Sequence, residues 1–121
     1  MTAAPRYVYN LCRRPDWDAA VAAGEYRGSA DDRRDGFIHF STAAQVAESA
    51  AKHRAGVADL LLLTVEAAVL GAALRWETSR GGQLFPHLYG ALPVASVLRV
   101  DALALGPDGR HVFPALNHDR R

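Results

Sequence analysis

The sequence predicts a single α+β domain. Strand-like and helix-like segments follow one another along the chain without the strict alternation that builds a doubly wound parallel sheet. The chain has 121 residues, half of them hydrophobic, which suits one domain with an ordinary core. We therefore take 1–121 as one domain, with its core at about 6–113 and a loose tail at 115–121.

The first third of the chain predicts a strand, a helix and a long loop. Residues 6–11 are aromatic and partly alternating, as in a strand. Pro15 and Asp16 open a helix that Gly24 ends. Residues 25–35 are polar and predict a loop, and loops of this length are often functional.

The middle of the chain predicts a second strand followed by an alanine-rich helix. Residues 37–40 form the strand. Ser41 or Thr42 caps the helix, and Gln45 lies three residues after Thr42, as a capping box requires. The helix is expected to end near Gly56.

The second half of the chain predicts three further strands. The continuous apolar run 59–65 indicates a central strand that is buried on both faces. Residues 74–77 predict a short strand, and residues 97–105 predict the last long one. Turns are expected at 66–71 and 91–95, a flexible Gly-rich loop at 78–84, and a short return strand at 110–113.

Charge and cysteine content argue against several classes of protein. The formal net charge is +1, which gives no reason to expect a nucleic acid or an anionic membrane as partner. Cys12 is the only cysteine, so no intrachain disulfide can form and a reducing compartment is favoured. The run Leu60–Leu63 is too short to span a bilayer, and the N-terminus lacks a signal-peptide core. We expect a cytoplasmic protein, and the sequence identifies no particular protein partner.

Two short runs carry most of the information about function. Gly36–Thr42 and Phe85–Gly90 each place one histidine among large apolar residues. A histidine at a strand end between such neighbours is typical of an imidazole presented to a pocket. The alternative for His39 is a core histidine bonded to the backbone, and the alternative for His87 is a structural loop whose aromatic residues cap the core. Because one small domain contains two such runs, we predict that His39 and His87 share one pocket.

Other polar residues adjoin these runs. Glu77 ends a short strand beside Trp76, where an apolar neighbour can tune the pKa of a general acid or base. Its alternative is a solvated carboxylate or an ion pair with an arginine. Tyr89 adds a hydroxyl to the second run. Ser41 and Thr42, at the expected helix start, would offer backbone N–H groups to a phosphate or a carboxylate.

A metal site is another use of the same side chains. Neither His39 nor His87 lies in an H-x-H or H-x-x-x-H arrangement, and Cys12 has no partner cysteine. No metal is therefore expected unless the fold brings His39, Glu77 and His87 together. The remaining histidines lie in polar stretches and are expected to be exposed: His53, His111 and His118.

Several segments together resemble the bacterial family called domain of unknown function 952. These segments are Tyr7–Tyr9, Asp35–Ser41 with the Gln45 that follows, Leu74–Glu77 and Phe85–Gly90. The resemblance covers the chain from about Tyr7 to Phe113. The two histidine runs are its most specific part.

That family is similar in fold to ADP-ribosyltransferases, which implies two small mixed β-sheets with flanking helices around an NAD cleft. In those enzymes a strand leads into a helix and carries a tyrosine that stacks on nicotinamide. Gly36 to Ser41 resembles this segment, with His39 at the place of the tyrosine. Their first strand usually bears a His or Arg for the NAD ribose, where this chain has Tyr9 and Asn10. NAD or a related nucleotide is the cofactor that the resemblance implies.

Three functions stay open. The first is an enzyme that transfers or hydrolyses at a nucleotide-linked ribose. The second is a non-catalytic module that binds a small ligand or a nucleotide. The third is a metal-assisted hydrolase that uses His39, Glu77 and His87. For the first function, the catalytic candidates are Glu77 and His87, and the ligand-binding candidates are His39, Ser41, Thr42, Tyr9 and Tyr89.

Overall fold

The computed structural model describes residues 5–116, which form eight strands, three α-helices and three short 3-10 helices. The strands are β1 (Tyr7–Arg13), β2 (Glu25–Tyr26), β3 (Ile38–His39), β4 (Leu60–Glu66), β5 (Leu74–Thr78), β6 (Leu84–Leu88), β7 (Leu92–Pro93) and β8 (Val97–Ala102). The helices are α1 (Arg14–Ala23), α2 (Ala30–Asp35), α3 (Val46–His53), η1 (Ala67–Ala73), η2 (Arg80–Gly82) and η3 (Val94–Ser96).

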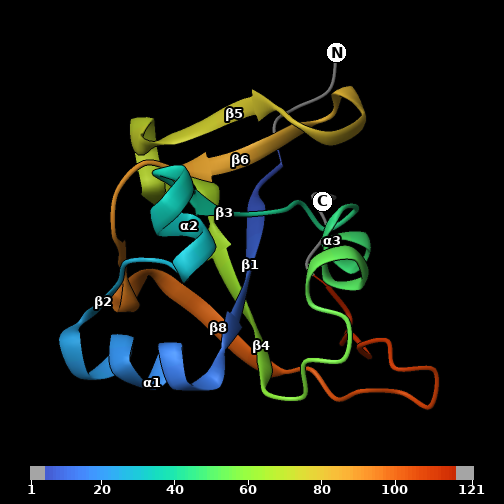
Figure 1. Cartoon of the computed structure of the whole chain (residues 1–121). Helices are drawn as coiled ribbons and strands as arrows, with labels where there is room; N and C mark the ends of the chain where they lie inside the picture. The colour runs from blue at the N-terminus through green and yellow to red at the C-terminus, as the bar shows by residue number, and fades with distance from the viewer. Residues whose placement is uncertain (1–4, 117–121) are drawn as a thin grey trace.

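The strands form two three-stranded sheets and one two-stranded sheet. Their orders are β1–β4–β8, β3–β6–β5 and β2–β7 (Figure 1). The α+β class is confirmed, but the expectation of mixed sheets is wrong, because every strand pair within residues 5–116 is antiparallel. A short loop joins β5 to β6, and a connection of this length can only join antiparallel neighbours.

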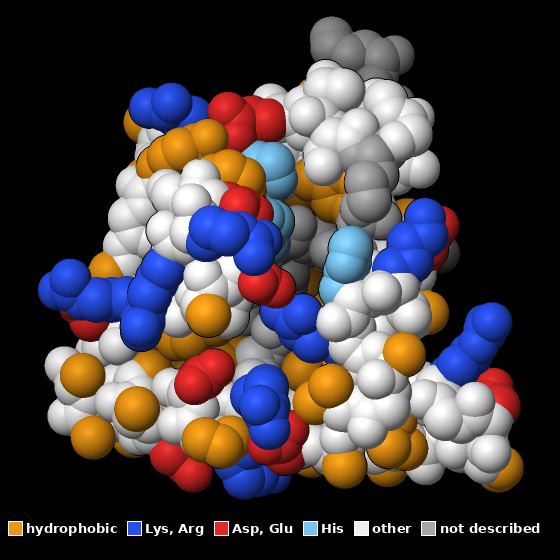
Figure 2. Space-filling model, viewed as in Figure 1, with side chains coloured by type: hydrophobic (Ala, Val, Ile, Leu, Met, Phe, Trp, Pro, Cys, Tyr) orange, Lys and Arg blue, Asp and Glu red, His pale blue; other side chains and the backbone are white. Residues whose placement is uncertain are grey.

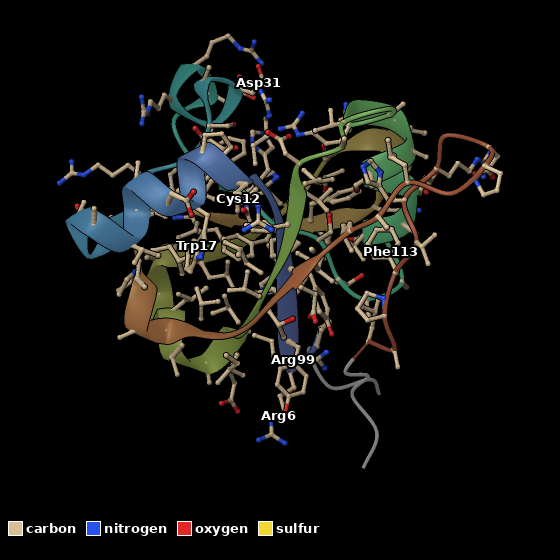
Figure 3. The ribbon with its side chains drawn as sticks, turned by 90° about the horizontal axis from the view of Figure 1, so that it is seen from below. Arg6, Cys12, Trp17, Asp31, Arg99 and Phe113 are labelled. Carbon is tan, nitrogen blue, oxygen red and sulfur yellow. The ribbon has the colours of Figure 1, made fainter. Side chains whose placement is uncertain are left out.

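The central strand β4 separates two parts of the hydrophobic core. Alternate residues of a strand point to opposite faces. Leu61 and Leu63 therefore pack with α1 on one side, while Leu60 and Leu62 pack on the other. Figure 3 shows Trp17 and Phe113 on opposite sides of this sheet. The central strand expected from the apolar run is confirmed.

The helices of residues 5–116 are short, and none is long and apolar enough to cross a membrane. Helix α2 lies where a loop was expected. Its start is a capping box: the Ser29 hydroxyl accepts the N–H of Asp32, and the Asp32 carboxylate accepts the N–H of Ser29. Asp32 is the only buried residue of α2, so the segment has no apolar periodicity that could reveal a helix.

Helix α3 begins at Val46, several residues after the expected cap. Ser41 exchanges backbone N–H···O bonds with Tyr9 of β1, so its backbone belongs to a bridge and not to a helix start. Gln45 Oε1 accepts the N–H of Thr42 at 3.0 Å, which is one half of the predicted capping box. The other half is missing, because no side chain caps α3.

The segment after β8 packs back on the core. Phe113 and Leu116 contact the cluster around Leu60 and Leu62. The predicted return strand is reduced to a single bridge between Leu105 and His111. His111 is half-buried and donates from Nε2 to the carbonyl of Val57 at 2.7 Å, so its expected exposure is wrong. His53 is exposed as expected. His118 and residues 117–121 of the expected tail lie outside the described residues.

Candidate functional site

The two histidine runs meet as neighbouring strands. His39 of β3 pairs directly with His87 of β6, and directly paired residues carry their side chains on the same face of the sheet. The two ring centroids are 5.6 Å apart. The prediction that His39 and His87 share one pocket is therefore confirmed.

A cavity of about 320 Å³ lies against this face. In Figure 1, α2 and α3 stand on either side of β1, beneath the β3–β6–β5 sheet. The cavity lies between these two helices, with His39 and His87 in its lining. Figure 2 shows histidine side chains beside a hollow on this face, with basic and acidic side chains around it. The other lining residues that matter below are Asn10, Asp31, Asp32, Asp35, Ser41, Ser49 and Arg54.

The buried carboxylate of Asp32 orients His39. Its side chain is 5% exposed, and Oδ1 lies 2.5 Å from Nδ1 of His39. A carboxylate only accepts hydrogen bonds, so Nδ1–H of the imidazole donates. The same oxygen accepts the backbone N–H of His39 at 3.2 Å, and Oδ2 accepts the N–H of Ser29. Asp32 thus joins the cap of α2 to the imidazole of β3.

A second carboxylate occupies the other nitrogen of His39. Nε2 lies 3.1 Å from Oδ2 of Asp35, and the His39 side chain is 43% exposed. His39 therefore lies between two carboxylates, one hydrogen-bonded to Nδ1 and one at ion-pair distance from Nε2. Arg34 first, and then His39, hold the pKa of Asp35 below its ordinary range.

Among the described side-chain contacts, His87 bonds to a single carboxylate, that of Glu77. Its Nδ1–H donates to Oε1 of Glu77 at 2.8 Å, and the hydroxyl of Tyr89 donates to the same oxygen at 2.8 Å. These two hydrogen bonds, His87 first, hold the pKa of Glu77 below its ordinary range. The Glu77 carboxylate in turn raises the pKa of Tyr89. In the neutral ring of His87, Nε2 is then a proton acceptor.

Phe37 keeps the two imidazoles in place. Its ring stacks on His87 with the centroids 4.0 Å apart and is tilted against His39 at 4.6 Å. The side chain of His87 is 8% exposed, so one face of the ring is covered by an apolar neighbour. This packing restricts the rotation of both rings, which is the preorganisation that acid–base chemistry needs.

The floor and the far wall of the cavity are polar. The hydroxyls of Ser41 and Ser49 lie 3.1 Å apart and share a hydrogen bond. Asn10 donates from Nδ2 to the backbone carbonyl of His39 at 2.9 Å, which ties β1 to β3. Arg54 follows α3 and is the basic side chain of the far wall. Hydroxyls and a guanidinium of this kind suit a polar, anionic ligand.

One comparison with known proteins shows the family of this chain. The family model described as "Protein of unknown function (DUF952)" matches residues 11–100. The chain belongs to the DUF952 family. The sequence matches no curated protein. The family description assigns no activity.

Solved structures from one organism share the fold of this DUF952 chain. The crystal structure of protein CC0527 from Caulobacter crescentus is 50% identical in sequence, with a TM-score of 0.86. The match covers 88% of this chain and 93% of that one. The solution NMR structure of CC0527 is 51% identical, with a TM-score of 0.78, and the match covers 86% and 90% of the two chains.

The predicted site residues of the DUF952 chain fall into two groups. His39, Ser41 and His87 line the cavity, and Glu77 and Tyr89 adjoin it through hydrogen bonds. Tyr9 and Thr42 do not line it. The ring of Tyr9 is buried in the core beside Leu60 and Leu62, because β1 packs on both faces.

The expected anion site at Ser41 and Thr42 is wrong. The N–H of Ser41 donates to the carbonyl of Tyr9, and that of Thr42 donates to Gln45. Neither N–H is therefore available to a ligand, because both are already bonded within the chain.

A metal site finds no support in the arrangement of the side chains. Within residues 5–116, no group of three or more His, Cys, Asp or Glu side chains could hold a metal ion. His39 and His87 each use Nδ1 to bond a carboxylate. Glu77 faces its hydrogen-bond partners and is absent from the cavity lining. The three residues therefore do not converge as metal ligands.

Sequence reasoning missed Asp32 and Arg54. Ser29-x-x-Asp32 is a capping-box pattern, and this local signal could have located α2 and its carboxylate. Arg54 carries no such signal, because it reaches the cavity only through the packing of α3 beside β1.

Proposed function

We propose that this chain has an ADP-ribosyltransferase-like fold and binds a nucleotide, NAD or a relative of it, in the cleft. It acts there at a bond to the ribose. The observation that carries the proposal is the pair of imidazoles 5.6 Å apart at one cavity, each held at Nδ1 by a carboxylate, with a second carboxylate beside Nε2 of His39. Pairs of titratable groups in contrasting environments are typical of acid–base catalysis.

The two imidazoles have different roles in the proposed reaction. Nε2 of His87 removes a proton from the attacking water or acceptor hydroxyl, whose oxygen forms the new bond to C1′ of the ribose. Nε2–H of His39 gives a proton to the departing group as its bond to C1′ breaks. The proton gained by His87 and the proton lost by His39 balance, and solvent restores both rings.

Glu77 and Asp32 act through the histidines. Each carboxylate accepts Nδ1–H of one ring and thereby fixes the tautomer and the direction of Nε2. The positive charge that develops on His87 during proton removal is stabilised by the Glu77 carboxylate. Glu77 and Asp32 are positioning residues in this scheme, and His39 and His87 are the catalytic residues.

The cavity suits one nucleoside phosphate. Its volume of about 320 Å³ is at the small end of the range for ligand pockets. Nε2 of His39 can reach the base, the serine hydroxyls can contact a ribose, and Arg54 can pair with a phosphate. A dinucleotide such as NAD would place only one of its halves in this space.

A proton donor is most useful for a leaving group that departs with negative charge. Nicotinamide leaves NAD as a neutral base and needs no proton, whereas a purine base or an oxygen-linked group does need one. Among ribose-linked bonds, the proposed His39 role therefore favours a purine nucleotide or an O-linked ribosyl ester over NAD.

The second candidate function is a non-catalytic nucleotide-binding module. It is favoured by β1, which offers the cavity the amide of Asn10 but no His or Arg that could hold a ribose. In this candidate function the cleft binds the nucleotide and catalyses no reaction.

Turnover separates the two candidates. The protein is incubated with AMP, ADP-ribose or NAD, and released adenine and nicotinamide are measured by chromatography. We expect release of base by the wild type and a loss on the order of a hundredfold or more in His87→Gln and His39→Gln. His53→Gln, an exposed histidine on the cavity rim, is the matched control and should keep its activity.

Three outcomes decide the matter. Binding of a nucleotide without turnover would leave the binding module as the function. Turnover that survives both substitutions would refute the assignment of the histidines. No binding at millimolar nucleotide would refute both candidates.

A further inference from the structure

Two acidic side chains of α2 face His39 and Arg54 in the cleft. Asp35 Oδ2 lies 3.1 Å from Nε2 of His39, and Asp31 Oδ2 lies 3.9 Å from a guanidinium nitrogen of Arg54. Arg54 follows α3, so the second contact crosses the cleft from one wall to the other. Carboxylates of the chain itself therefore face His39 and Arg54, two side chains of the cleft to which an anionic ligand can bind.

We infer that Asp31 and Asp35 hold the places of an anionic ligand, and that the ligand of this cleft carries a phosphate that binds Arg54. The inference rests on the proposed function in that a nucleotide supplies the phosphate. A guanidinium presents paired N–H groups that match two phosphate oxygens. The Arg54 side chain is 23% exposed, so a phosphate bound there is partly shielded from solvent and from salt.

Arg34 provides the displaced carboxylates with another partner. Its guanidinium already lies 3.1 Å from Oδ1 of Asp31 and 3.2 Å from Oδ1 of Asp35. The oxygens facing Arg54 and His39 are the opposite ones, Oδ2 in both residues. Each carboxylate can therefore leave its cleft partner and keep its contact with Arg34, and exposed ion pairs of this kind are weak.

This exchange links binding to the proposed chemistry. Once Asp35 withdraws, Nε2–H of His39 is available to the departing group, which develops negative charge where the Asp35 carboxylate was. Arg54 meanwhile binds the phosphate in place of Asp31. An unphosphorylated nucleoside brings no anion to replace Asp31, so it should bind more weakly than its phosphate.

The test measures the affinities of adenosine 5′-monophosphate, adenosine and inorganic phosphate by calorimetry. Asp31→Asn should tighten the binding of the monophosphate by about fivefold, because it removes the competing carboxylate. Arg54→Gln should weaken it by about tenfold. Neither change should alter the affinity for adenosine. Asp18→Asn and Arg99→Gln make the same charge changes at residues that do not line the cavity, and they should alter nothing.

The outcomes separate this inference from the proposed function. Equal affinities for the monophosphate and adenosine in every variant would overturn the phosphate site and leave nucleotide binding intact. Binding of inorganic phosphate with the expected pattern of variants, but of neither nucleoside, would support the phosphate site and overturn the nucleotide. Absence of binding by all three probes would overturn both. Amide NMR spectra of Asp31→Asn and Arg54→Gln that match the wild type outside the cleft establish that the variants are folded.

Discussion

Removal of the Asp32 carboxylate should lower the free energy of unfolding more than removal of most other side chains in this fold. It accepts three hydrogen bonds: the N–H of Ser29 at 2.8 Å, the backbone N–H of His39 at 3.2 Å and the imidazole Nδ1–H at 2.5 Å. The residue is 4% exposed, so little water can replace the lost acceptor. At about 1 to 1.5 kcal/mol per donor, Asp32→Ala should lower the free energy of unfolding by about 3 to 4.5 kcal/mol.

Asp32→Asn separates the cap from the imidazole. The amide keeps one oxygen as an acceptor, but its NH₂ group faces an N–H donor whose hydrogen bond it cannot accept. We expect this variant to lose about half as much, about 1.5 to 2 kcal/mol. Asp31→Asn, one residue earlier and exposed, is the control and should change stability by less than about 0.5 kcal/mol.

Urea unfolding followed by tryptophan fluorescence measures these differences, because Trp17 and Trp76 are both half-buried against the core. A loss below 1 kcal/mol in Asp32→Ala would refute the reasoning, since it would mean that the three donors find other partners. In NMR spectra, the downfield Nδ1–H resonance of His39 should disappear in Asp32→Ala and persist in Asp31→Asn.

Three further predictions follow from single positions. At Gly28, where φ is +100°, an added Cβ would lie 2.6 Å from Cβ of Asp32, whereas at Gly24, where φ is +90°, nothing lies within 4 Å of it. In urea unfolding, Gly28→Ala should therefore lower the free energy of unfolding by about 2 kcal/mol or more, and Gly24→Ala by about 1 kcal/mol. The hydrogen bond from His87, and after it the one from Tyr89, hold the pKa of Glu77 below its ordinary value of 4.5. These contacts therefore stabilise the fold above about pH 4.5, and the stabilisation is lost as the pH falls through the lowered pKa of the folded state. The melting temperatures of wild type and Glu77→Gln should accordingly differ most near pH 6 and converge toward pH 3, and a gap independent of pH would contradict this. Burial raises the pKa of Cys12 to about 12, so a thiol reagent should label it at pH 8 only after denaturation, and rapid labelling of the native protein would show that the thiol is accessible.

Local patterns in the sequence were sufficient for the class of fold and for the two histidines. The apolar run of β4 has no polar interruption until Thr64, and such a run predicts a strand buried on both faces whatever its partners are. Histidine between aromatic residues is equally local, and it identified His39 and His87 as pocket residues. Each of these features depends on the spacing of neighbouring residues, which the sequence states directly.

Tertiary structure alone decided how the site is assembled. The pairing of His39 with His87 depends on strand register, and a slip of one residue would send one ring to the opposite face. Burial of Tyr9 and exposure of Arg54 to the cavity follow from how β1 and α3 pack, which no local pattern encodes. Asp32 is intermediate: its capping motif is local, but its bond to His39 exists only because α2 folds back over β3. A six-residue helix with one buried side chain lacks periodicity, so its place in the site is settled by contacts between segments and not by the pattern within one.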